Sequence, residues 1–282
     1  MAILKRDGAD LYYQTVGEGP ALIFIPGANG TGDIFTQAAE YLKDRFTVVM
    51  FDRRGYGKSQ LTDEAPAEIA NIDSTYRIKT DASDVKALAE LVTPNQKVYI
   101  MGSSSGSIVA MEVLQDFPEI VERIAFHEPP LNSYLPEAER NRDQANNNEI
   151  VDTALKEDMQ VAMKKFAKAM RIGGLDAKMM GKPAAGADEA ATDARIKGMQ
   201  YWFKYEIRQY TSRKIDVEGL KKLSDKINML VGTDSRGSYP QDRANELGKI
   251  WHAHVYDIPG GHLGYSQKPE GFATTLAAVL IK

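Results

Sequence analysis

The sequence predicts an α/β fold in which a mostly parallel central sheet of about eight strands is flanked by helices. Short, continuous apolar segments, typical of strands buried on both faces, alternate with longer segments whose apolar residues recur at helical spacing. This alternation favours a parallel sheet, because parallel neighbours are joined by crossovers that usually contain a helix. With 282 residues and a hydrophobic content of 43%, the chain can bury a large core around such a sheet.

Eight segments carry the strand pattern. They span residues 2–4, 11–16, 21–25, 46–51, 98–101, 120–126, 227–232 and 254–258. The first two flank a turn at Asp7–Gly8 and are expected to form an antiparallel edge of the sheet. Helices are expected from Asp33, which is predicted to cap the first of them, over 78–92, after Gly106, near 241–247 and over 269–281. Residues 60–73 are polar and contain a proline, so a surface loop is expected there.

The pattern changes between about residues 131 and 220, where helical spacing replaces the strand pattern. The expected elements are, in order, an amphipathic helix over 149–172, a stop at Gly173–Gly174, a Gly/Ala/Pro-rich connector at 181–190 and a second helix over 193–210. We interpret this segment as an inserted helical lid. The predicted organisation is an α/β core of residues 1–130 and 216–282 with a lid of residues 131–215.

Composition limits the classes of partner. The net charge of −4 and the sequence pI near 5.7, without a basic stripe, argue against nucleic-acid binding. The absence of cysteine excludes a disulfide framework and a thiolate metal site. Neither an apolar secretory signal nor an apolar run of the ~18 residues needed for a membrane span is found in the sequence. We therefore expect a cytoplasmic protein, a monomer or homodimer, that acts on a small molecule away from the membrane.

The segment Gly102-Ser103-Ser104-Ser105-Gly106 joins a strand pattern to a helical pattern. In this context G-x-S-x-G predicts a nucleophile elbow, a strained turn that lifts the central hydroxyl clear of the sheet. Gly102 and Gly106 allow the strand and the helix to pass close together. Ser104 is therefore the candidate nucleophile.

A serine hydroxyl is a weak nucleophile at neutral pH and needs a base whose pKa is near 7, for which imidazole is suited. The chain contains 4 histidines. His252 and His254 are expected to be ordinary residues at the start of a strand, and His127 is expected to be structural. His262 is the candidate base, because it lies in a glycine-rich loop late in the chain, which suits the order nucleophile, acid, base.

Four motifs follow one another along the chain. They are Pro26-Gly27-Ala28-Asn29-Gly30, Asp52-Arg53-Arg54-Gly55-Tyr56-Gly57-Lys58-Ser59, the segment around Ser104, and Gly260-Gly261-His262. With them the sequence resembles the α/β-hydrolase superfamily over nearly its whole length. The resemblance implies an oxyanion hole made by the backbone amides of Ala28 and Ser105. Pro26 stands where the family usually has histidine, which leaves these amides in place but removes one side-chain brace of the loop. We expect the Asp-Arg-Arg-Gly stretch to brace the top of the sheet without reacting.

Two carboxylates are candidates for the acid that orients His262. In most members of the superfamily the acid follows the seventh strand, three residues beyond a glycine, and that position is Ser235 here, one residue after Asp234. A minority, including some lactone hydrolases and haloalkane dehalogenases, place the acid after the sixth strand, where Glu128 lies. We favour Glu128 and keep Asp234 as the alternative.

These residues predict a carboxylic ester hydrolase that cleaves a small ester or lactone through an acyl-enzyme and needs no metal or organic cofactor. Serine at position 104 argues against the dehalogenase and epoxide hydrolase branches, which need a carboxylate nucleophile. Three alternatives remain open: a carbon–carbon bond hydrolase with the same residues, a cofactor-free oxygenase, and a hydrolase-fold binding protein without turnover.

Overall fold

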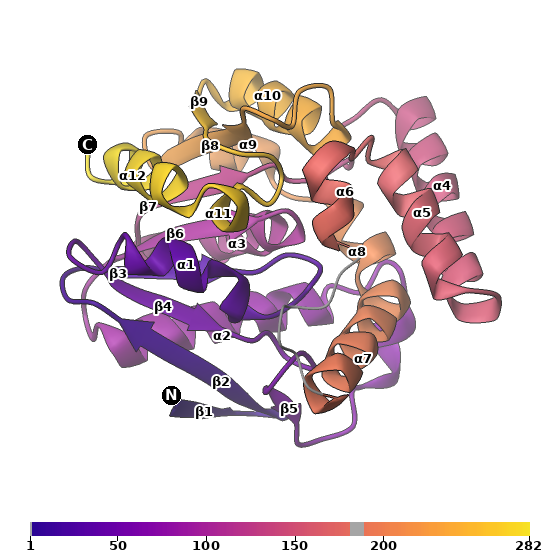
Figure 1. Ribbon diagram of the computed structural model, residues 1–282, viewed down its shortest axis with the longest axis horizontal. Coiled ribbons are helices and arrows are strands. Elements are labelled where there is room, and N and C mark those ends of the chain that lie inside the picture. The colour runs from indigo at the N-terminus through magenta and orange to yellow at the C-terminus, as the bar shows by residue number, and fades with distance from the viewer. Residues whose placement is uncertain (1, 181–188) are drawn as a thin grey trace.

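A computed structural model describes residues 2–180 and 189–282 of the chain. Within these residues, nine strands form one sheet in the order β1-β2-β4-β3-β6-β7-β8-β9, with β5 paired to β2. Helices cover both faces of the sheet, and a further group of helices lies to one side of it (Figure 1). The predicted α/β-hydrolase fold is confirmed.

The strands are β1 (Ala2–Arg6), β2 (Ala9–Val16), β3 (Ala21–Ile25), β4 (Thr47–Phe51), β5 (Gln60–Leu61), β6 (Val98–Ser103), β7 (Val121–His127), β8 (Ile227–Gly232) and β9 (His254–Ile258). The strand β2 is antiparallel to both β1 and β4, as expected for the edge of the sheet. All pairs from β4 through β3, β6, β7 and β8 to β9 are parallel. The ninth strand, β5, occupies two residues of the segment that was expected to be a loop.

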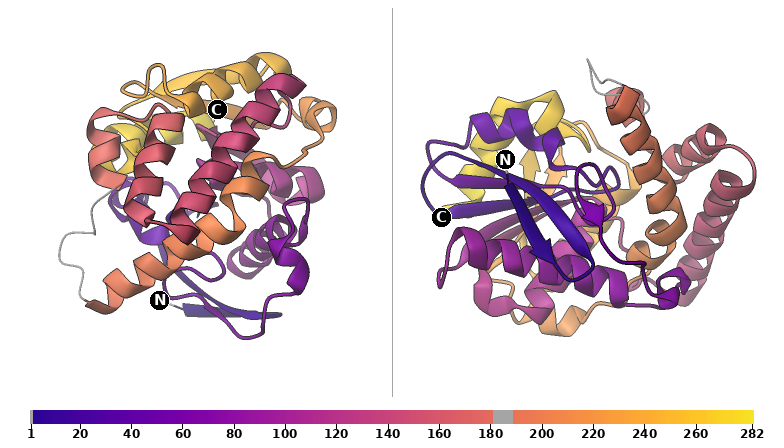
Figure 2. Two further views of the ribbon diagram at one scale, coloured as in Figure 1. Left: turned by 90° about the vertical axis from the view of Figure 1, so that its right-hand side faces the viewer. Right: turned by 90° about the horizontal axis from the view of Figure 1, so that it is seen from below.

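The helices of the core form a layer on each face of the sheet (Figure 2). One layer contains α2 (Tyr76–Val92), α3 (Ser105–Asp116), α9 (Val217–Lys221) and α10 (Tyr239–Trp251), and the other contains α1 (Thr36–Glu40), α11 (Gly264–Gln267) and α12 (Pro269–Leu280). Three short 3-10 helices complete the core: η1 (Gly32–Phe35), η2 (Ala67–Ala70) and η3 (Pro118–Ile120).

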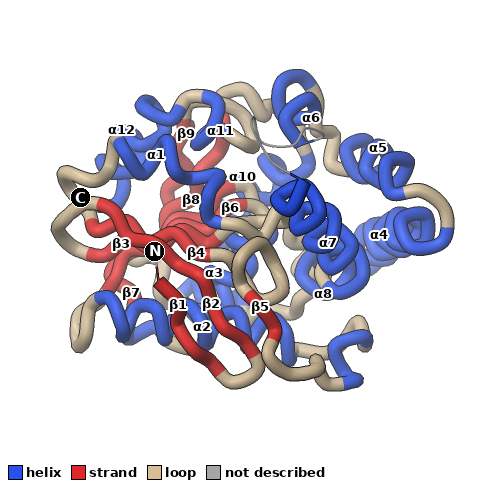
Figure 3. The backbone as a smooth tube through the Cα atoms, turned by 60° about the horizontal axis from the view of Figure 1, so that its bottom comes forward, coloured by secondary structure: helices blue, strands red, loops and turns tan. Residues whose placement is uncertain are grey.

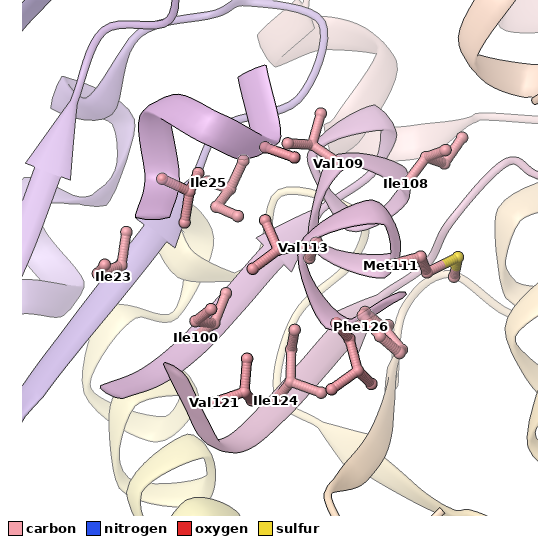
Figure 4. Close-up of a cluster of buried hydrophobic side chains, with 14 of the residues drawn as sticks. Ile23, Ile25, Ile100, Ile108, Val109, Met111, Val113, Val121, Ile124 and Phe126 are labelled. Atoms are coloured by element: carbon pink, nitrogen blue, oxygen red, sulfur yellow. The ribbon is translucent and has the colours of Figure 1, made fainter. Parts of the chain in front are cut away.

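The strand β3 shows why continuous apolar runs form the centre of this sheet. All five of its residues are buried. Because successive side chains of a strand point to opposite faces, Ile23 and Ile25 belong to the cluster that packs on α3, drawn in Figure 4, whereas Leu22 and Phe24 belong to the cluster on the other face. Both faces of the strand are therefore covered by helices, and a polar residue has no exposed position on it.

Between β7 and β8 the chain leaves the sheet. It forms α4 (Glu137–Lys156), α5 (Met159–Ala169), α6 (Gly174–Met180), α7 (Glu189–Tyr205) and α8 (Ile207–Thr211). We call residues 131–215 the helical insertion; its helices are grouped beside the sheet in Figures 1 and 3. A separate apolar cluster joins the insertion to the core; it includes Phe166, Trp202 and Phe203 of the insertion and Tyr56 and Tyr239 of the core.

Both helices predicted in the insertion are divided in the structure. The prediction over 149–172 is wrong at Asp158, which has extended backbone and whose side chain accepts the Val161 N–H at 2.9 Å, so that it caps a new helix. The prediction over 193–210 is wrong at Glu206, which separates α7 from α8 and sends its carboxylate into the core. Helical periodicity continues across both breaks, so it does not reveal them.

Two smaller expectations also differ from the structure. Asp33 lies inside η1 rather than capping a helix, and the residue at the cap position is Thr31, whose hydroxyl donates to Asp33 Oδ1 at 2.5 Å. Gly174 begins α6 with a φ of 57°, whereas the preceding helix has already ended at Ala169. Of the predicted connector, residues 181–188 lie outside the described residues and 189–190 belong to α7.

Candidate active site

The parallel sheet brings the candidate residues to one edge. Ser103 at the end of β6 pairs with His127 at the end of β7, which in turn pairs with Leu230 of β8. The loops that follow these strands, and those that follow β3 and β9, therefore leave from the same edge, where sites of open α/β sheets are usually built. These loops carry Ala28, Ser104, Glu128, Asp234 and His262.

Ser104 occupies the sharp turn between β6 and α3. Its φ of 56° and ψ of −126° are rare for a residue with a side chain, and its N–H donates to His127 O at 2.9 Å. A Cβ on Gly102 would lie 2.4 Å from Gly106 O, and a Cβ on Gly106 would lie 2.3 Å from Ile25 O. Both neighbouring positions therefore require glycine. The side chain of Ser104 remains partly exposed.

The loop after β3 passes directly beside this turn. A Cβ on Gly27 would lie 2.9 Å from the Cβ of Ser104. In the described part of the chain, the N–H of the next residue, Ala28, donates to no other group. Ser105 is the first residue of α3, where backbone amides lack an intrahelical partner. Two amides free to bind an oxyanion thus lie in the loop and at the helix start that adjoin Ser104.

His262 and Glu128 are in direct contact. Nδ1 of His262 lies 2.7 Å from Oε2 of Glu128, whose Oε1 accepts the Gly232 N–H at 2.8 Å. The residues are 4% and 0% exposed, respectively. Glu128 has a φ of 49°, which is rare for a residue with a side chain. Because Nδ1 is engaged by the carboxylate, Nε2 is the ring nitrogen left to accept a proton.

The surroundings shift the pKa values of this pair in opposite directions. Burial by itself raises the pKa of Glu128, but the hydrogen bond to His262 and the neighbouring imidazoles lower it more, so the pKa lies below its ordinary value. Burial by itself lowers the pKa of His262, but the hydrogen bond to Glu128 and the charges of Glu128 and Asp176 raise it more. The geometry therefore suits an ionised carboxylate that stabilises an imidazolium.

No hydrogen bond joins the Ser104 hydroxyl to any group among the described residues. Ser104 and His262 both adjoin His127, whose carbonyl accepts the Ser104 N–H and whose ring lies 6.0 Å from the ring of His262, centroid to centroid. Hydrogen bonds between a nucleophile and its base are often long without substrate and shorten when substrate binds. The absence of a hydrogen bond between the Ser104 hydroxyl and His262 is therefore compatible with their action as nucleophile and base.

The other histidines have different surroundings. His127 is fully buried, and burial lowers its pKa to about 4, so its ring is neutral at physiological pH. His252 and His254 are exposed at the junction of α10 and β9. A neutral, packed ring is a poor candidate for a base that must gain and lose a proton near pH 7. His252 precedes β9 and His254 begins it, so both lie at the edge of the sheet opposite to the loop of Ser104.

Asp234 does not contact His262. Its side chain is 52% exposed and accepts hydrogen bonds from Lys268 Nζ at 2.9 Å and from the Thr233 hydroxyl at 3.0 Å. Its backbone N–H donates to Gly260 O at 2.9 Å. Of the two candidate acids, the structure thus brings Glu128 to the histidine and leaves Asp234 at the surface.

Asp176 of α6, which the sequence analysis did not single out, holds the loop of His262. Its Oδ2 accepts the His262 N–H at 3.0 Å, and its Oδ1 accepts the Leu263 N–H at 2.9 Å and Gln267 Nε2 at 2.6 Å. The residue is 6% exposed. In the sequence, Asp176 lies shortly after Gly173 and Gly174 in a helical pattern, and no motif there indicates these contacts.

Arg53, Arg77, Asp81 and Glu206 form a buried ionic cluster that no pattern in the sequence indicates. Arg53 Nη1 and Nη2 each lie 2.9 Å from one oxygen of Glu206, and Nη1 lies 2.9 Å from Asp81 Oδ2. Arg77 Nη2 lies 2.5 Å from Glu206 Oε1. Burial by itself lowers the pKa of Arg53, but Glu206, Tyr56 and Asp81 keep it well above its ordinary value. Arg53 therefore stays charged.

A cavity of about 170 Å³ lies between the Asp7–Gly8 turn, α2 and α7, and neither Ser104 nor His262 lines it. Over residues 2–180 and 189–282, no three histidine, aspartate or glutamate side chains are grouped so as to hold a metal ion. None of the helices described is long and apolar enough to cross a membrane.

Comparisons with known proteins agree with the fold. The family model for the alpha/beta hydrolase fold matches residues 20–161. The chain is 29% identical over 285 residues to the uncharacterized hydrolase YraK of Bacillus subtilis, which covers 99% of this chain and 95% of that protein. A thermophilic esterase from Thermogutta terrifontis shares the fold at a TM-score of 0.69 and 17% identity over 97% of this chain and 93% of that one. The enol-lactonase from Burkholderia xenovorans LB400 shares the fold at a TM-score of 0.64 and 18% identity, over 100% of both chains. The chain therefore belongs to the α/β-hydrolase family.

Proposed function

We propose that this protein is a serine hydrolase that cleaves a small-molecule carboxylic ester or lactone through an acyl-enzyme. The observation that carries the proposal is the 2.7 Å contact between His262 Nδ1 and Glu128 Oε2, which keeps Nε2 available as a proton acceptor. The strained turn at Ser104 supplies a nucleophile at the same edge of the sheet. The identity of 29% to a protein named a hydrolase over nearly the whole chain supports the same conclusion.

In the proposed reaction, Ser104 Oγ attacks the carbonyl carbon of the substrate while His262 Nε2 takes the hydroxyl proton. The tetrahedral intermediate collapses, the bond to the alcohol oxygen breaks, and His262 returns the proton to that oxygen. Water then attacks the acyl group on Ser104, with His262 again as the base, and the carboxylic acid is released. Glu128 remains ionised and stabilises the imidazolium at each step.

The negative charge on the carbonyl oxygen would be held by the amides of Ala28 and Ser105. Both are backbone groups held in place before the reaction, so they need little reorganisation when the charge develops. Each donor of this kind is worth about 3 kcal/mol of barrier.

We further propose that the helical insertion is a lid, and that residues 1–130 and 216–282 form the core below it. Ala28 packs against the apolar cluster that joins the insertion to the core, and Asp176 of the insertion holds the loop of His262. Four methionines contact the same cluster: Met159, Met163, Met180 and Met199.

The test is to treat the purified protein with a fluorophosphonate probe and to identify the labelled residue by mass spectrometry. We expect a single adduct on Ser104, and a pre-steady-state burst of alcohol release from a p-nitrophenyl ester. A screen of acyl esters and lactones of increasing chain length then identifies the substrate class. Turnover of a diketone without turnover of esters would replace the proposed reaction by carbon–carbon bond hydrolysis.

Ser104→Ala removes the nucleophile and should lower kcat by at least ~10⁴ without changing the fold. Ser235→Ala is a matched control, because this buried hydroxyl lies near the same edge and has no hydrogen-bond partner in the described structure. It should be labelled and should turn over like the wild type. Near wild-type turnover by folded Ser104→Ala would end the proposal.

A further inference from the structure

One residue, Arg53, holds the turn that carries Ala28. The Gly30 N–H donates to Gly27 O at 2.9 Å and closes the turn. Arg53 contacts both ends of it: its backbone N–H donates to Gly30 O at 2.8 Å, and its Nη2 donates to Gly27 O at 2.7 Å. The side chain is 1% exposed, so water does not compete for these contacts.

The Gly27 carbonyl and the Ala28 N–H belong to the same planar, trans peptide group. Because C=O and N–H point in opposite directions in such a group, a contact that fixes the carbonyl also fixes the direction of the N–H. A hydrogen bond from a charged guanidinium is stronger than one from a neutral donor, and it withdraws electron density from the peptide nitrogen. Arg53 can therefore both aim and polarise the amide of Ala28.

We infer that Arg53 is a positioning residue for the oxyanion hole, acting through Gly27 O on the Ala28 N–H that receives the substrate oxyanion. The inference rests on the proposed function and deepens it. It adds a role for a charged side chain that does not itself touch the reacting atoms.

The remaining contacts of Arg53 hold its guanidinium in one orientation. Two parallel hydrogen bonds join it to both oxygens of Glu206, and a third joins Nη1 to Asp81. Its guanidinium carbon lies 4.9 Å from the centre of the Tyr56 ring. A planar fork is needed for this set of contacts, and the single ammonium of lysine cannot reproduce it.

The sequence offers a reason why such a brace is needed. The loop after β3 contains Pro26, and a proline side chain donates no hydrogen bond. Arg53, from the loop after β4, supplies a donor to the loop after β3 instead. The loop after β3 thus receives from the loop after β4 a side-chain hydrogen bond that Pro26 cannot supply.

A loss of activity alone would not prove this role, because Arg53 also joins the insertion to the core. Arg54 provides a matched control. It is 7% exposed and pairs with Asp84 through Nε and Nη2 at 2.5 and 2.9 Å, but it makes no contact with the Gly27–Gly30 turn. Arg54→Lys therefore disturbs a neighbouring buried arginine–carboxylate pair without touching the oxyanion loop.

The experiment compares Arg53→Lys, Arg53→Gln and Arg54→Lys with the wild type. We would measure kcat and KM for a p-nitrophenyl ester and Ki for a trifluoromethyl ketone. The adduct of this ketone with Ser104 carries an oxyanion like that of the tetrahedral intermediate. We expect both Arg53 variants to lower kcat by roughly 30- to 100-fold and to weaken the ketone by a similar factor, with KM changed less than about threefold. For Arg54→Lys, the values of kcat, KM and Ki should each stay within about threefold of those of the wild type.

Circular dichroism and thermal unfolding establish that each variant is folded, and Arg53→Lys keeps the buried positive charge if Arg53→Gln does not fold. Wild-type kcat and Ki in either folded Arg53 variant would overturn the inference. Equal losses in Arg54→Lys would also overturn it, because they would assign the effect to a general weakening of the fold. If the wild type neither hydrolyses the ester nor is labelled on Ser104, it is the proposed function that fails.

Discussion

Replacing Glu128 by glutamine tests which carboxylate orients His262. Glu128 accepts two hydrogen bonds at once, from the Gly232 N–H at 2.8 Å and from the His262 ring at 2.7 Å. Glutamine has one oxygen and one NH₂ group, so it can accept only one of them. With its oxygen toward Gly232, its NH₂ donates to Nδ1 and forces the imidazole proton onto Nε2, where it blocks proton transfer from Ser104.

The opposite orientation of the glutamine amide restores the reactive tautomer at a cost. It sets the NH₂ group against the buried Gly232 N–H, which leaves two donors unpaired at about 1–3 kcal/mol each. It also lacks the negative charge that stabilises the imidazolium. The two effects together amount to roughly 4–6 kcal/mol, or about 10³–10⁴ in kcat, similar to the ~10⁴ loss known for such a change in a serine triad.

Asp234→Asn is the matched comparison. Asp234 is at the surface, pairs with Lys268 and does not contact His262, so its amide should keep kcat within about threefold. Both variants are assayed with a p-nitrophenyl ester after their thermal unfolding has been compared with that of the wild type. A larger loss of activity in Asp234→Asn than in Glu128→Gln would refute the role of Glu128, as would folded Glu128→Gln that retains more than about a tenth of wild-type kcat.

Two further predictions concern the base and the helical insertion. Burial lowers the pKa of His262 but Glu128 and Asp176 raise it more, and neutral His262 is the reactive form, so kcat/KM should fall with decreasing pH at an apparent pKa above 6.5. Asp176→Asn removes one of these charges and should shift the fall in kcat/KM to lower pH. An unchanged pH profile would contradict the assigned contact between Asp176 and His262. The variant Trp251→Phe keeps Trp202 of the insertion, and Trp202→Phe keeps Trp251 of the core, so the tryptophan fluorescence of each variant reports the unfolding of one part. Because buried ion pairs join the two parts, their midpoints in urea should coincide, and an earlier transition at Trp202 would contradict this coupling.

The centre of the sheet could be predicted because its strands are buried on both faces. The run Ala21–Ile25 must be apolar at every position, and such runs, bounded by glycine and proline, are visible without any knowledge of tertiary contacts. Once the strands are known to be parallel, the loops after them must meet at one edge. Topology therefore predicts that Ser104 and His262 lie near each other, even though they are 158 positions apart in the sequence.

Topology does not predict which carboxylate reaches the histidine. Glu128 and Asp234 each follow a neighbouring parallel strand, so both begin at the same edge. The backbone beyond each strand decides between them. Glu128 turns inward with a φ of 49°, whereas the amide of Asp234 is tied to Gly260 O and its side chain points to Lys268. Neither turn has a pattern in the sequence that specifies it.

The contacts of the helical insertion were beyond the reach of sequence periodicity for a different reason. Asp176 contacts a residue 86 positions away, and Glu206 contacts one 153 positions away. Each acid interrupts or begins a helix, and in the sequence each resembles an ordinary surface acid. Their partners become known only when the fold has brought the insertion against the core.

These partners also show that the core is incomplete by itself. All the residues proposed for the triad lie in the core, so its sequence suggests a complete site. Yet the buried guanidinium of Arg53 and the N–H of His262 are donors that the core does not fully pair, and a buried donor without an acceptor is costly. Glu206 and Asp176, both from the insertion, supply those acceptors, one beside the loop of Ala28 and one beside the loop of His262. The two carboxylates of the insertion thus complete the hydrogen bonding of the loops on which the proposed chemistry depends.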